Sequence, residues 1–259
     1  MLNSPLNIKN ETDNSSAAAE AFEKLYMRIR KKEQRLYTDE EVRNLPQIAV
    51  THPHFKEWLL RKRSCDWLIE YLDQKNKALH ILEIGCGNGW LSAQLAKNTS
   101  GHVVGMDINK EELTQAVRVF GDIYNLKFIS GDIRTAQLEH NSFNIIIFAA
   151  SVQYFSSLKE IMQAAFQCLR AGGEVHILDT IFYKKNKVEA ARQRTKDYYT
   201  TLGFPEASDY YYHHCIEDLK NFSAKILYDP ISWMHKFSKN KYPFFWVCIK
   251  KPGNPESNP

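Results

Sequence analysis

The chain has 259 residues, of which 44% are apolar and 12% aromatic, enough to bury one sizeable hydrophobic core. Its formal net charge of +4 lies well below the strongly basic balance that by itself points to nucleic acid. The longest apolar runs, such as residues 143–152, contain polar side chains and are half as long as the roughly 20 residues that a membrane span needs. We therefore expect no membrane span and no membrane partner.

The cysteines and the two chain ends bear on the cellular setting. Five cysteines stand alone, without the C-x-x-C pair that is typical of zinc or redox sites. Residues 1–19 lack the basic start and apolar core of a secretory signal. They and residues 252–259 have few large apolar side chains, which predicts disordered tails. We expect a cytoplasmic protein with reduced thiols and no metal site, and the sequence predicts no oligomeric state.

Three helices are predicted ahead of the first strand, and together they would form an N-terminal helical cap over residues 20–75. Residues 21–35 are helix-like and highly charged. Thr38 is a good N-cap for a short helix that ends before Pro46. Residues 55–72 have the apolar spacing of an amphipathic helix. The charged side chains expected on the outer face of that helix are Arg61, Lys62 and Arg63.

Short apolar runs then alternate with helical stretches, which predicts a mostly parallel α/β sheet, doubly wound, with helices on both faces. Strands are expected near 80–84, 102–107, 126–130, 143–149 and 174–181, with helices near 89–97, 110–120, 157–170 and 186–202. Residues 224–228 and 244–249 form a predicted hairpin, which adds an antiparallel C-terminal strand and brings the sheet to seven strands. One domain over residues 76–251 is expected, with a cap insert at about 183–215.

The first predicted strand runs into a glycine-rich turn at residues 85–89, which opens the next helix. Glycines allow positive φ and the close approach of a ligand, and the helix N-terminus presents free N–H groups. The dinucleotide fingerprint G-x-G-x-x-G needs a glycine where Trp90 stands, which disfavours NAD and a dehydrogenase. Glu83 suits a ligand with a positive amine better than a pyrophosphate. A turn without a ligand is the alternative, and three alternate glycines disfavour it.

The spacing E-x-G-x-G-x-G over residues 83–89 resembles motif I of class I S-adenosylmethionine-dependent methyltransferases. The resemblance extends over about residues 80–180 and, more loosely, to the small-molecule group called type 11. It implies a Rossmann-like methyltransferase domain with S-adenosylmethionine as cofactor and S-adenosylhomocysteine as product. The cofactor-binding residues that it implies are Glu83, Gly85, Cys86, Gly87, Gly89, Asp107, Ile108, Asp132, Ile133, Ala149 and Ala150.

Later strands support this resemblance. Asp107 ends the second strand, where a carboxylate can accept both ribose hydroxyls; capping of the next helix by it or by Asn109 is the alternative. Asp132 and Ile133 resemble the family's adenine site, although Gly-Asp can also form a simple turn. The small residues after the fourth strand would admit a planar ligand. The glycines at 172–173 are expected to end a helix.

The segment 183–215 is rich in tyrosine and histidine, and such aromatic walls with polar tips suit a ring or a cationic substrate. The alternative is that these side chains only pack the insert onto the sheet. Candidates for substrate binding are Gln153, Tyr154, Tyr183, Tyr198, Tyr211 and His214. Weak candidates for a base are Tyr154, His213 and His214; the two adjacent histidines are not expected to bind metal. The N-terminal cap and residues 183–214 are predicted to roof the acceptor position.

The predicted function is methyl transfer to a small-molecule acceptor by in-line displacement. One alternative is an RNA methyltransferase, because the basic strings at 28–32 and 61–63 could track a phosphate backbone, although such charges usually form a solvated helix face. The other is a non-catalytic subunit that binds S-adenosylmethionine. A closed or filled cavity beside Tyr154 would favour that subunit.

Overall fold

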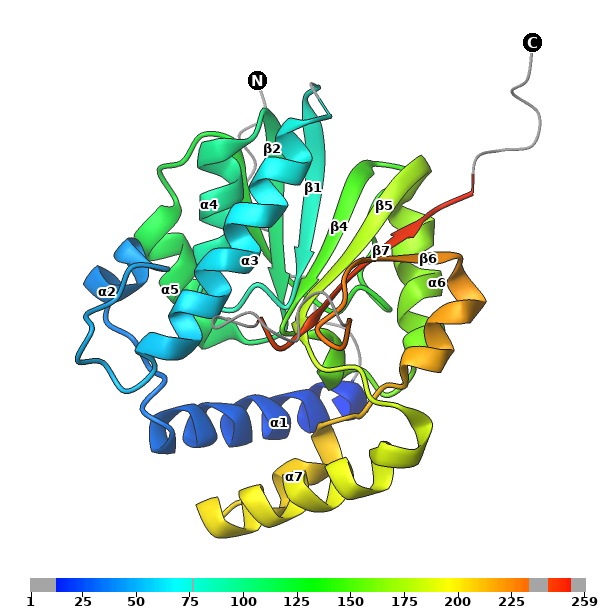
Figure 1. Cartoon of the computed structure of the whole chain (residues 1–259). Coiled ribbons are helices and arrows are strands. Elements are labelled where there is room, and N and C mark those ends of the chain that lie inside the picture. The colour runs from blue at the N-terminus through cyan, green and yellow to red at the C-terminus, as the bar shows by residue number, and fades with distance from the viewer. Residues whose placement is uncertain (1–12, 76, 233–241, 253–259) are drawn as a thin grey trace.

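A computed structural model describes residues 13–75, 77–232 and 242–252 of the chain (Figure 1). Its centre is one seven-stranded sheet with the strand order β3-β2-β1-β4-β5-β7-β6. The strands are β1 (Leu79–Ile84), β2 (Gly101–Asp107), β3 (Leu126–Ser130), β4 (Phe143–Ala149), β5 (Leu169–Thr180), β6 (Ala224–Tyr228) and β7 (Phe245–Lys250). The first five pair in parallel, and β7 is antiparallel to both β5 and β6. The predicted α/β class and the C-terminal hairpin are confirmed.

Helices cover both faces of the sheet, as predicted (Figure 1). They are α1 (Asp13–Lys32), α2 (Asp39–Asn44), α3 (Phe55–Asp73), α4 (Trp90–Asn98), α5 (Lys110–Phe120), α6 (Leu158–Cys168) and α7 (Val188–Leu202). Short 3-10 turns are η1 (Val152–Tyr154), η2 (Lys185–Lys187), η3 (Pro205–Tyr210) and η4 (Ile216–Phe222). Buried side chains of α3, α4 and α5 form one core cluster with the sheet, and those of α6 form the other.

The central strand β1 is apolar on both faces because both faces are covered. Ile81 packs in the cluster with α3, α4 and α5, whereas Leu82 packs in the cluster with α6, and both are fully buried. Continuous apolar runs of this kind are typical of strands inside a parallel sheet. Among the described residues, no helix has both the length and the apolar character needed to cross a membrane.

Helix α1 begins at Asp13, inside the range 1–19 that was predicted to be a disordered tail. Farther along it, Leu25 and Ile29 pack with Ala207 of η3 in a third, smaller apolar cluster. Composition could not reveal this contact, because the partner lies far along the chain. Residues 1–12, and residues 253–259 of the predicted C-terminal tail, lie outside the described residues.

The passage into β5 also differs from the prediction. Helix α6 ends at Cys168 and β5 starts at once, so the glycines at 172–173 lie within the strand and do not end the helix. The reason is that Leu169 is buried and already pairs with Phe143, while Glu174 pairs with Ile145. The residues between form a bulge, where Gly172 has a φ of +70°.

The N-terminal cap and the insert after β5 meet beyond one end of the sheet. Helices α1 and α7 lie beside each other there (Figure 1), joined through η3. The turn that follows β1 and the residues that follow β4 face this same end, where the carboxyl ends of the parallel strands meet. The N-terminal cap and the insert thus form a roof over this end of the sheet, and its relation to the acceptor position stays a prediction.

Candidate active site

A cavity of about 500 Å³ lies between the carboxyl ends of the strands and the roof, within the size range of small-molecule sites. Residues from three parts of the chain form much of its wall. The turn after β1 and the end of β4 contribute Glu83, Gly85, Cys86, Gly87, Ala149 and Ala150; α1 and α3 contribute Tyr26, Arg30 and Arg61; the insert and η1 contribute Gln153, Tyr154, Tyr183, Tyr198 and Tyr211. Segments far apart in sequence thus surround one space.

All three glycines of the turn have positive φ, but contacts inside the protein also require two of them. A Cβ on Gly85 would lie 2.5 Å from Cβ of Ser151, and one on Gly89 would lie 2.5 Å from Cζ of Phe128. Gly87 borders the cavity, and a Cβ there would lie 3.1 Å from the Glu112 carboxylate. Gly89 is outside the cavity wall. The expectation that these glycines let a ligand approach the backbone closely therefore fits Gly87 best.

Glu83 provides a buried carboxylate in the cavity wall. It is 2% exposed and accepts a hydrogen bond from the Ser92 hydroxyl. Burial outweighs that hydrogen bond and raises the pKa of Glu83 to about 8. A cationic amine beside it would favour the ionised carboxylate, so the site fits the ammonium group of an amino acid.

Asp107 closes the glycine turn at the end of β2. Its Oδ2 accepts from the Gly87 N–H at 2.7 Å, and its Oδ1 accepts from the Asn109 N–H at 2.8 Å. Asn109, not Asp107, caps α5, since its side chain accepts from the Glu112 N–H at 2.9 Å. Asp107 and Ile108 are outside the cavity wall, although Asp107 binds Gly87, which is part of it. Ribose binding by Asp107 stays a prediction.

Asp132 and Ile133 are not brought to the cavity. The Arg134 guanidinium donates to both carboxylate oxygens of Asp132, with Nε at 3.0 Å from each. Ile133 is 4% exposed and packs in the cluster with α6. Neither residue is in the cavity wall, and Arg134, two residues on, binds the Asp132 carboxylate. The adenine contact of these two residues stays a prediction.

Five of the six predicted substrate residues lie in the cavity wall, and His214 is the exception. His214 is not in the wall, and its Nε2 lies 3.0 Å from the Val152 carbonyl. His213 is also outside the wall, with its Nε2 2.9 Å from Thr195 Oγ1. Both histidines lie outside the cavity wall, and their role as bases stays a prediction. Tyr154 is in the wall.

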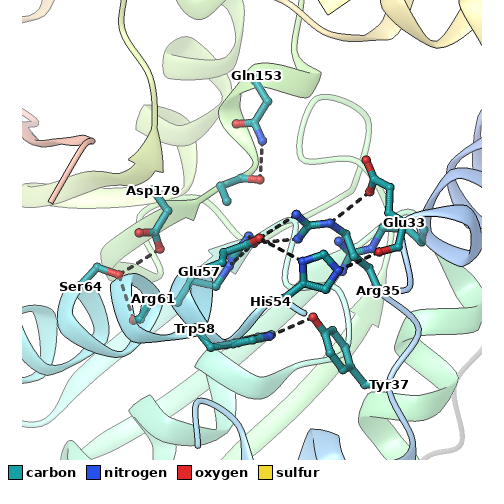
Figure 2. Close-up of polar contacts among 12 residues, drawn as sticks. Glu33, Arg35, Tyr37, His54, Glu57, Trp58, Arg61, Ser64, Gln153 and Asp179 are labelled. Carbon is teal, nitrogen blue, oxygen red and sulfur yellow. Dashed lines mark hydrogen bonds and ion pairs between the residues drawn. The ribbon is translucent and has the colours of Figure 1, made fainter. Parts of the chain in front are cut away.

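One wall of the cavity is a charged network between α3 and the segment after α1 (Figure 2). Glu57 receives hydrogen bonds from Arg35 at 2.8 Å and from Arg61 at 3.0 Å. Burial opposes the ionisation of Glu57, but these two guanidinium groups outweigh it and lower its pKa to about 2. Arg61, predicted on the outer face of α3, therefore faces the cavity, because Glu57 one turn earlier holds it there.

Asp179, at the carboxyl end of β5, is a cavity residue that the sequence interpretation missed. Its carboxylate accepts from the Ser64 hydroxyl at 3.0 Å (Figure 2) and from the Tyr242 hydroxyl at 2.6 Å. Its φ of +54° is a strained conformation for a non-glycine residue. The signal was present, since an acid at the end of a parallel strand faces the same edge as Asp107.

A second polar cluster lies away from the cavity. Glu174, His176 and Cys248 have donor atoms within 4.8 Å of one another. Lys75 already binds the Glu174 carboxylate at 2.8 Å, and Trp246 donates to His176 Nδ1 at 3.1 Å. Protein groups thus already bind the Glu174 carboxylate and the Nδ1 atom of His176, and we assign this cluster a structural role.

The sheet order, the glycine turn with its acid and the cavity at the carboxyl ends define a class I methyltransferase, whose cofactor is S-adenosylmethionine. A family model described as "Methyltransferase domain" matches residues 75–225, more than half of the chain. The chain belongs to this family. The resemblance seen in residues 80–180 is confirmed.

Known relatives are distant. Phosphoethanolamine N-methyltransferase 1 of Triticum aestivum is 28% identical over 139 residues, which cover 50% of this chain and 28% of that protein. The ubiquinone/menaquinone biosynthesis C-methyltransferase UbiE of Wigglesworthia glossinidia brevipalpis is 24% identical over 186 residues, 68% of this chain and 73% of that protein. The matched part of this chain spans less than half the length of several curated relatives.

Solved structures share the fold. The magnesium protoporphyrin IX methyltransferase of Synechocystis PCC 6803, solved with bound S-adenosylhomocysteine, superposes with a TM-score of 0.56 at 14% identity. The likeness covers 92% of this chain and 98% of that one, so it includes the N-terminal and C-terminal parts of the fold.

Proposed function

We propose that the protein transfers the methyl group of S-adenosylmethionine to a small-molecule acceptor by in-line displacement. One observation carries the proposal: a single cavity joins the turn after β1 to the tyrosine-rich wall of the insert. A cofactor on the turn and an acceptor against the tyrosines would then share one cavity. When bound, S-adenosylmethionine supplies an already reactive methyl group on a sulfonium.

The residues of the chain would bind, orient and exclude water. Glu83 and the turn at Gly85 and Gly87 would hold the amino-acid end of the cofactor. The roof of α1 and α7 would shield the reacting atoms from solvent. Alignment and water exclusion are the main contributions that such a reaction needs from a protein.

Proton removal from the acceptor, where it is needed, is best assigned to Asp179. Burial raises the pKa of the Tyr154 hydroxyl above its ordinary value, so Tyr154 stays protonated near neutral pH and would donate a hydrogen bond. Burial also raises the pKa of Asp179, which makes its carboxylate a better proton acceptor than an exposed one. Asp179 thus replaces the two histidines as our candidate base.

The RNA alternative loses support from the placement of the basic strings. Arg30 and Arg61, one from each string, face the cavity, which leaves Arg28, Lys31 and Lys32 as the exposed cations of the first string. The non-catalytic alternative was to be favoured by a closed cavity beside Tyr154, and the cavity there is open. Both alternatives remain outcomes of the test below. A cytoplasmic location is also a proposal, supported by the five free cysteines.

The test combines binding with turnover. Calorimetry of the full chain with S-adenosylhomocysteine should give a micromolar or tighter dissociation constant. Incubation with methyl-labelled S-adenosylmethionine and a panel of small amines, phenols and carboxylic acids should then label one class of acceptor. Asp179→Asn should lower kcat for an acceptor that must lose a proton and leave S-adenosylhomocysteine binding unchanged.

Three results would count against the proposal. Absence of S-adenosylhomocysteine binding would refute it. Binding without labelling of any small molecule, together with labelling of RNA, would favour the RNA alternative. Binding with labelling of neither would favour the non-catalytic subunit.

A further inference from the structure

The N-terminal helix α1 places a guanidinium group inside the cavity without a full set of partners. Arg30 lines the cavity, and its Nε is shielded from solvent. Four buried side-chain polar atoms lack a hydrogen-bond partner among the described residues, and only the one on Arg30 belongs to the cavity wall. Buried donors of this kind are rare and call for an explanation such as a missing ligand.

The protein groups around Arg30 do not satisfy it. Its Nη2 lies 3.7 Å from Oε1 of Glu112, too far for a hydrogen bond. Its guanidinium carbon lies 5.6 Å from the centre of the Tyr26 ring, a cation–π contact that uses none of the N–H donors. Arg61, the neighbouring cation in the wall, differs because it donates to Glu57.

The position of Arg30 relates it to the glycine turn. Glu112, its ion-pair partner, is also the group that a Cβ on Gly87 would meet at 3.1 Å. Arg30 therefore lies on the Gly87 side of the cavity, and Glu83 is in the wall of the same cavity. The two acids there suit an ammonium group, and Arg30 suits an anion.

An amino acid carries an ammonium group and a carboxylate on one carbon, so its binding site needs an acid and a base close together. We propose that Arg30 binds the methionine carboxylate of S-adenosylmethionine while Glu83 binds the ammonium group. A guanidinium offers a fork of N–H donors that matches a carboxylate. This inference rests on the proposed function, and it assigns part of the cofactor site to a helix that precedes the matched family region.

The consequence is a coupling between α1 and the cofactor. Arg30 sits on α1, whose neighbouring residue Ile29 packs against the insert at Ala207. A cofactor held by Arg30 would therefore stabilise the packing of α1 on the insert. An empty site leaves the buried Nε of Arg30 without a partner.

The test compares two ligands on four proteins. The ligands are S-adenosylhomocysteine and its decarboxylated analogue, which keeps the amine and lacks only the carboxylate. The proteins are the full chain, Arg30→Gln, Arg30→Lys and the control Arg28→Gln. Arg28 is on the same helix, exposed, and stacks over the Phe204 ring at 5.0 Å, so the control removes the same charge outside the cavity.

The full chain should bind S-adenosylhomocysteine about tenfold to hundredfold more tightly than the decarboxylated analogue. Arg30→Gln should lose that difference, because only its affinity for S-adenosylhomocysteine should fall. Arg30→Lys should keep part of it, because a lysine retains the charge without the planar fork. Arg28→Gln should behave as the full chain does. Arg30→Lys also serves as the test variant if Arg30→Gln does not fold, as judged by its thermal melt.

Two results would overturn the inference while leaving the proposed function intact. One is unchanged S-adenosylhomocysteine binding by Arg30→Gln and Arg30→Lys. The other is an equal loss of affinity for both ligands in these variants, which would show that Arg30 does not act on the carboxylate. If the full chain bound neither ligand, the proposed function and this inference would both fail.

Discussion

The hydroxyl of Tyr198 in α7 donates a hydrogen bond to the carboxylate of Glu33, just after α1, across 165 residues of sequence. Glu33 also pairs with Arg35 at 3.2 Å, so the bond ties α7 to the charged wall of the cavity. Together with the apolar cluster of Leu25, Ile29 and Ala207, it holds the two parts of the roof together.

Removing this hydrogen bond should loosen the roof. In Tyr198→Phe, the dissociation rate of S-adenosylhomocysteine should increase about threefold to tenfold, the size expected for one partly exposed hydrogen bond. Stopped-flow measurement of tryptophan fluorescence would follow the release. Tyr124→Phe, at an exposed tyrosine of α5's C-terminal loop, is the control and should leave the rate unchanged. An unchanged rate in Tyr198→Phe would mean that α7 does not retain the ligand.

Two glycines with positive φ, Gly89 in the glycine turn and Gly203 after α7, should differ in the stability that is lost on substitution by alanine. Gly203 has a φ of +91° and open space where a Cβ would go, so Gly203→Ala should cost about 1–2 kcal/mol in unfolding free energy from backbone strain alone. Gly89 has a φ of +75° and Phe128 2.5 Å from that position, so Gly89→Ala should cost a further 1–3 kcal/mol or so from overpacking. Urea unfolding of both variants measures the difference. Equal losses would contradict the packing role of Gly89.

Cofactor binding should release a proton. In the free protein the pKa of Glu83 is about 8, so at pH 7 this carboxyl group is mostly protonated. An ammonium group beside it favours the carboxylate, and the proton must leave. The affinity for S-adenosylhomocysteine should therefore rise between pH 6 and pH 8. Burial also raises the pKa of Glu112, to about 7, so this neighbour can contribute in the same range.

Calorimetry in two buffers of different ionisation enthalpy measures the released proton. Glu83→Gln should abolish the part of the release that Glu83 supplies and weaken binding about tenfold to hundredfold. Glu112→Gln measures the part of the proton release that Glu112 supplies. A pH-independent affinity in the full chain would show that neither carboxyl group senses the ligand.

Acid should destabilise the fold through Glu174. Burial opposes ionisation of this carboxyl group, but hydrogen bonds from His176 and Lys75 lower its pKa to about 2. A pKa below the ordinary 4.5 in the folded state means that the stabilisation is present above about pH 4.5 and is lost as the pH falls toward 2. Thermal melts over this range should show a fall that is smaller in Glu174→Gln, which keeps the part that Glu57 supplies. Glu206→Gln, at an exposed glutamate, should keep the fall.

Much of the fold is evident in the local pattern of the chain. The strands at 126–130, 143–149 and 224–228 and the helix at 110–120 agree with their predicted bounds, because apolar periodicity and capping depend on nearby residues. The glycine turn is equally local, and the family match confirms the class of protein that it implied. The bulge at 170–173 was not evident, because it depends on the pairing of β5 with β4.

The wall of the cavity depends instead on contacts across the chain. Arg61 was expected on a solvated face and Arg30 in a basic string, yet both face the cavity, since Glu57 holds one and the docking of α1 buries the other. Asp132 lies outside the cavity wall and binds Arg134, a contact that the strand-and-turn pattern did not indicate. A helical pattern shows which side chains share a face of a helix, and only tertiary packing decides what that face meets. The sequence therefore indicated the cofactor turn, whereas the packing of α1, α3 and α7 decided which charged groups surround it.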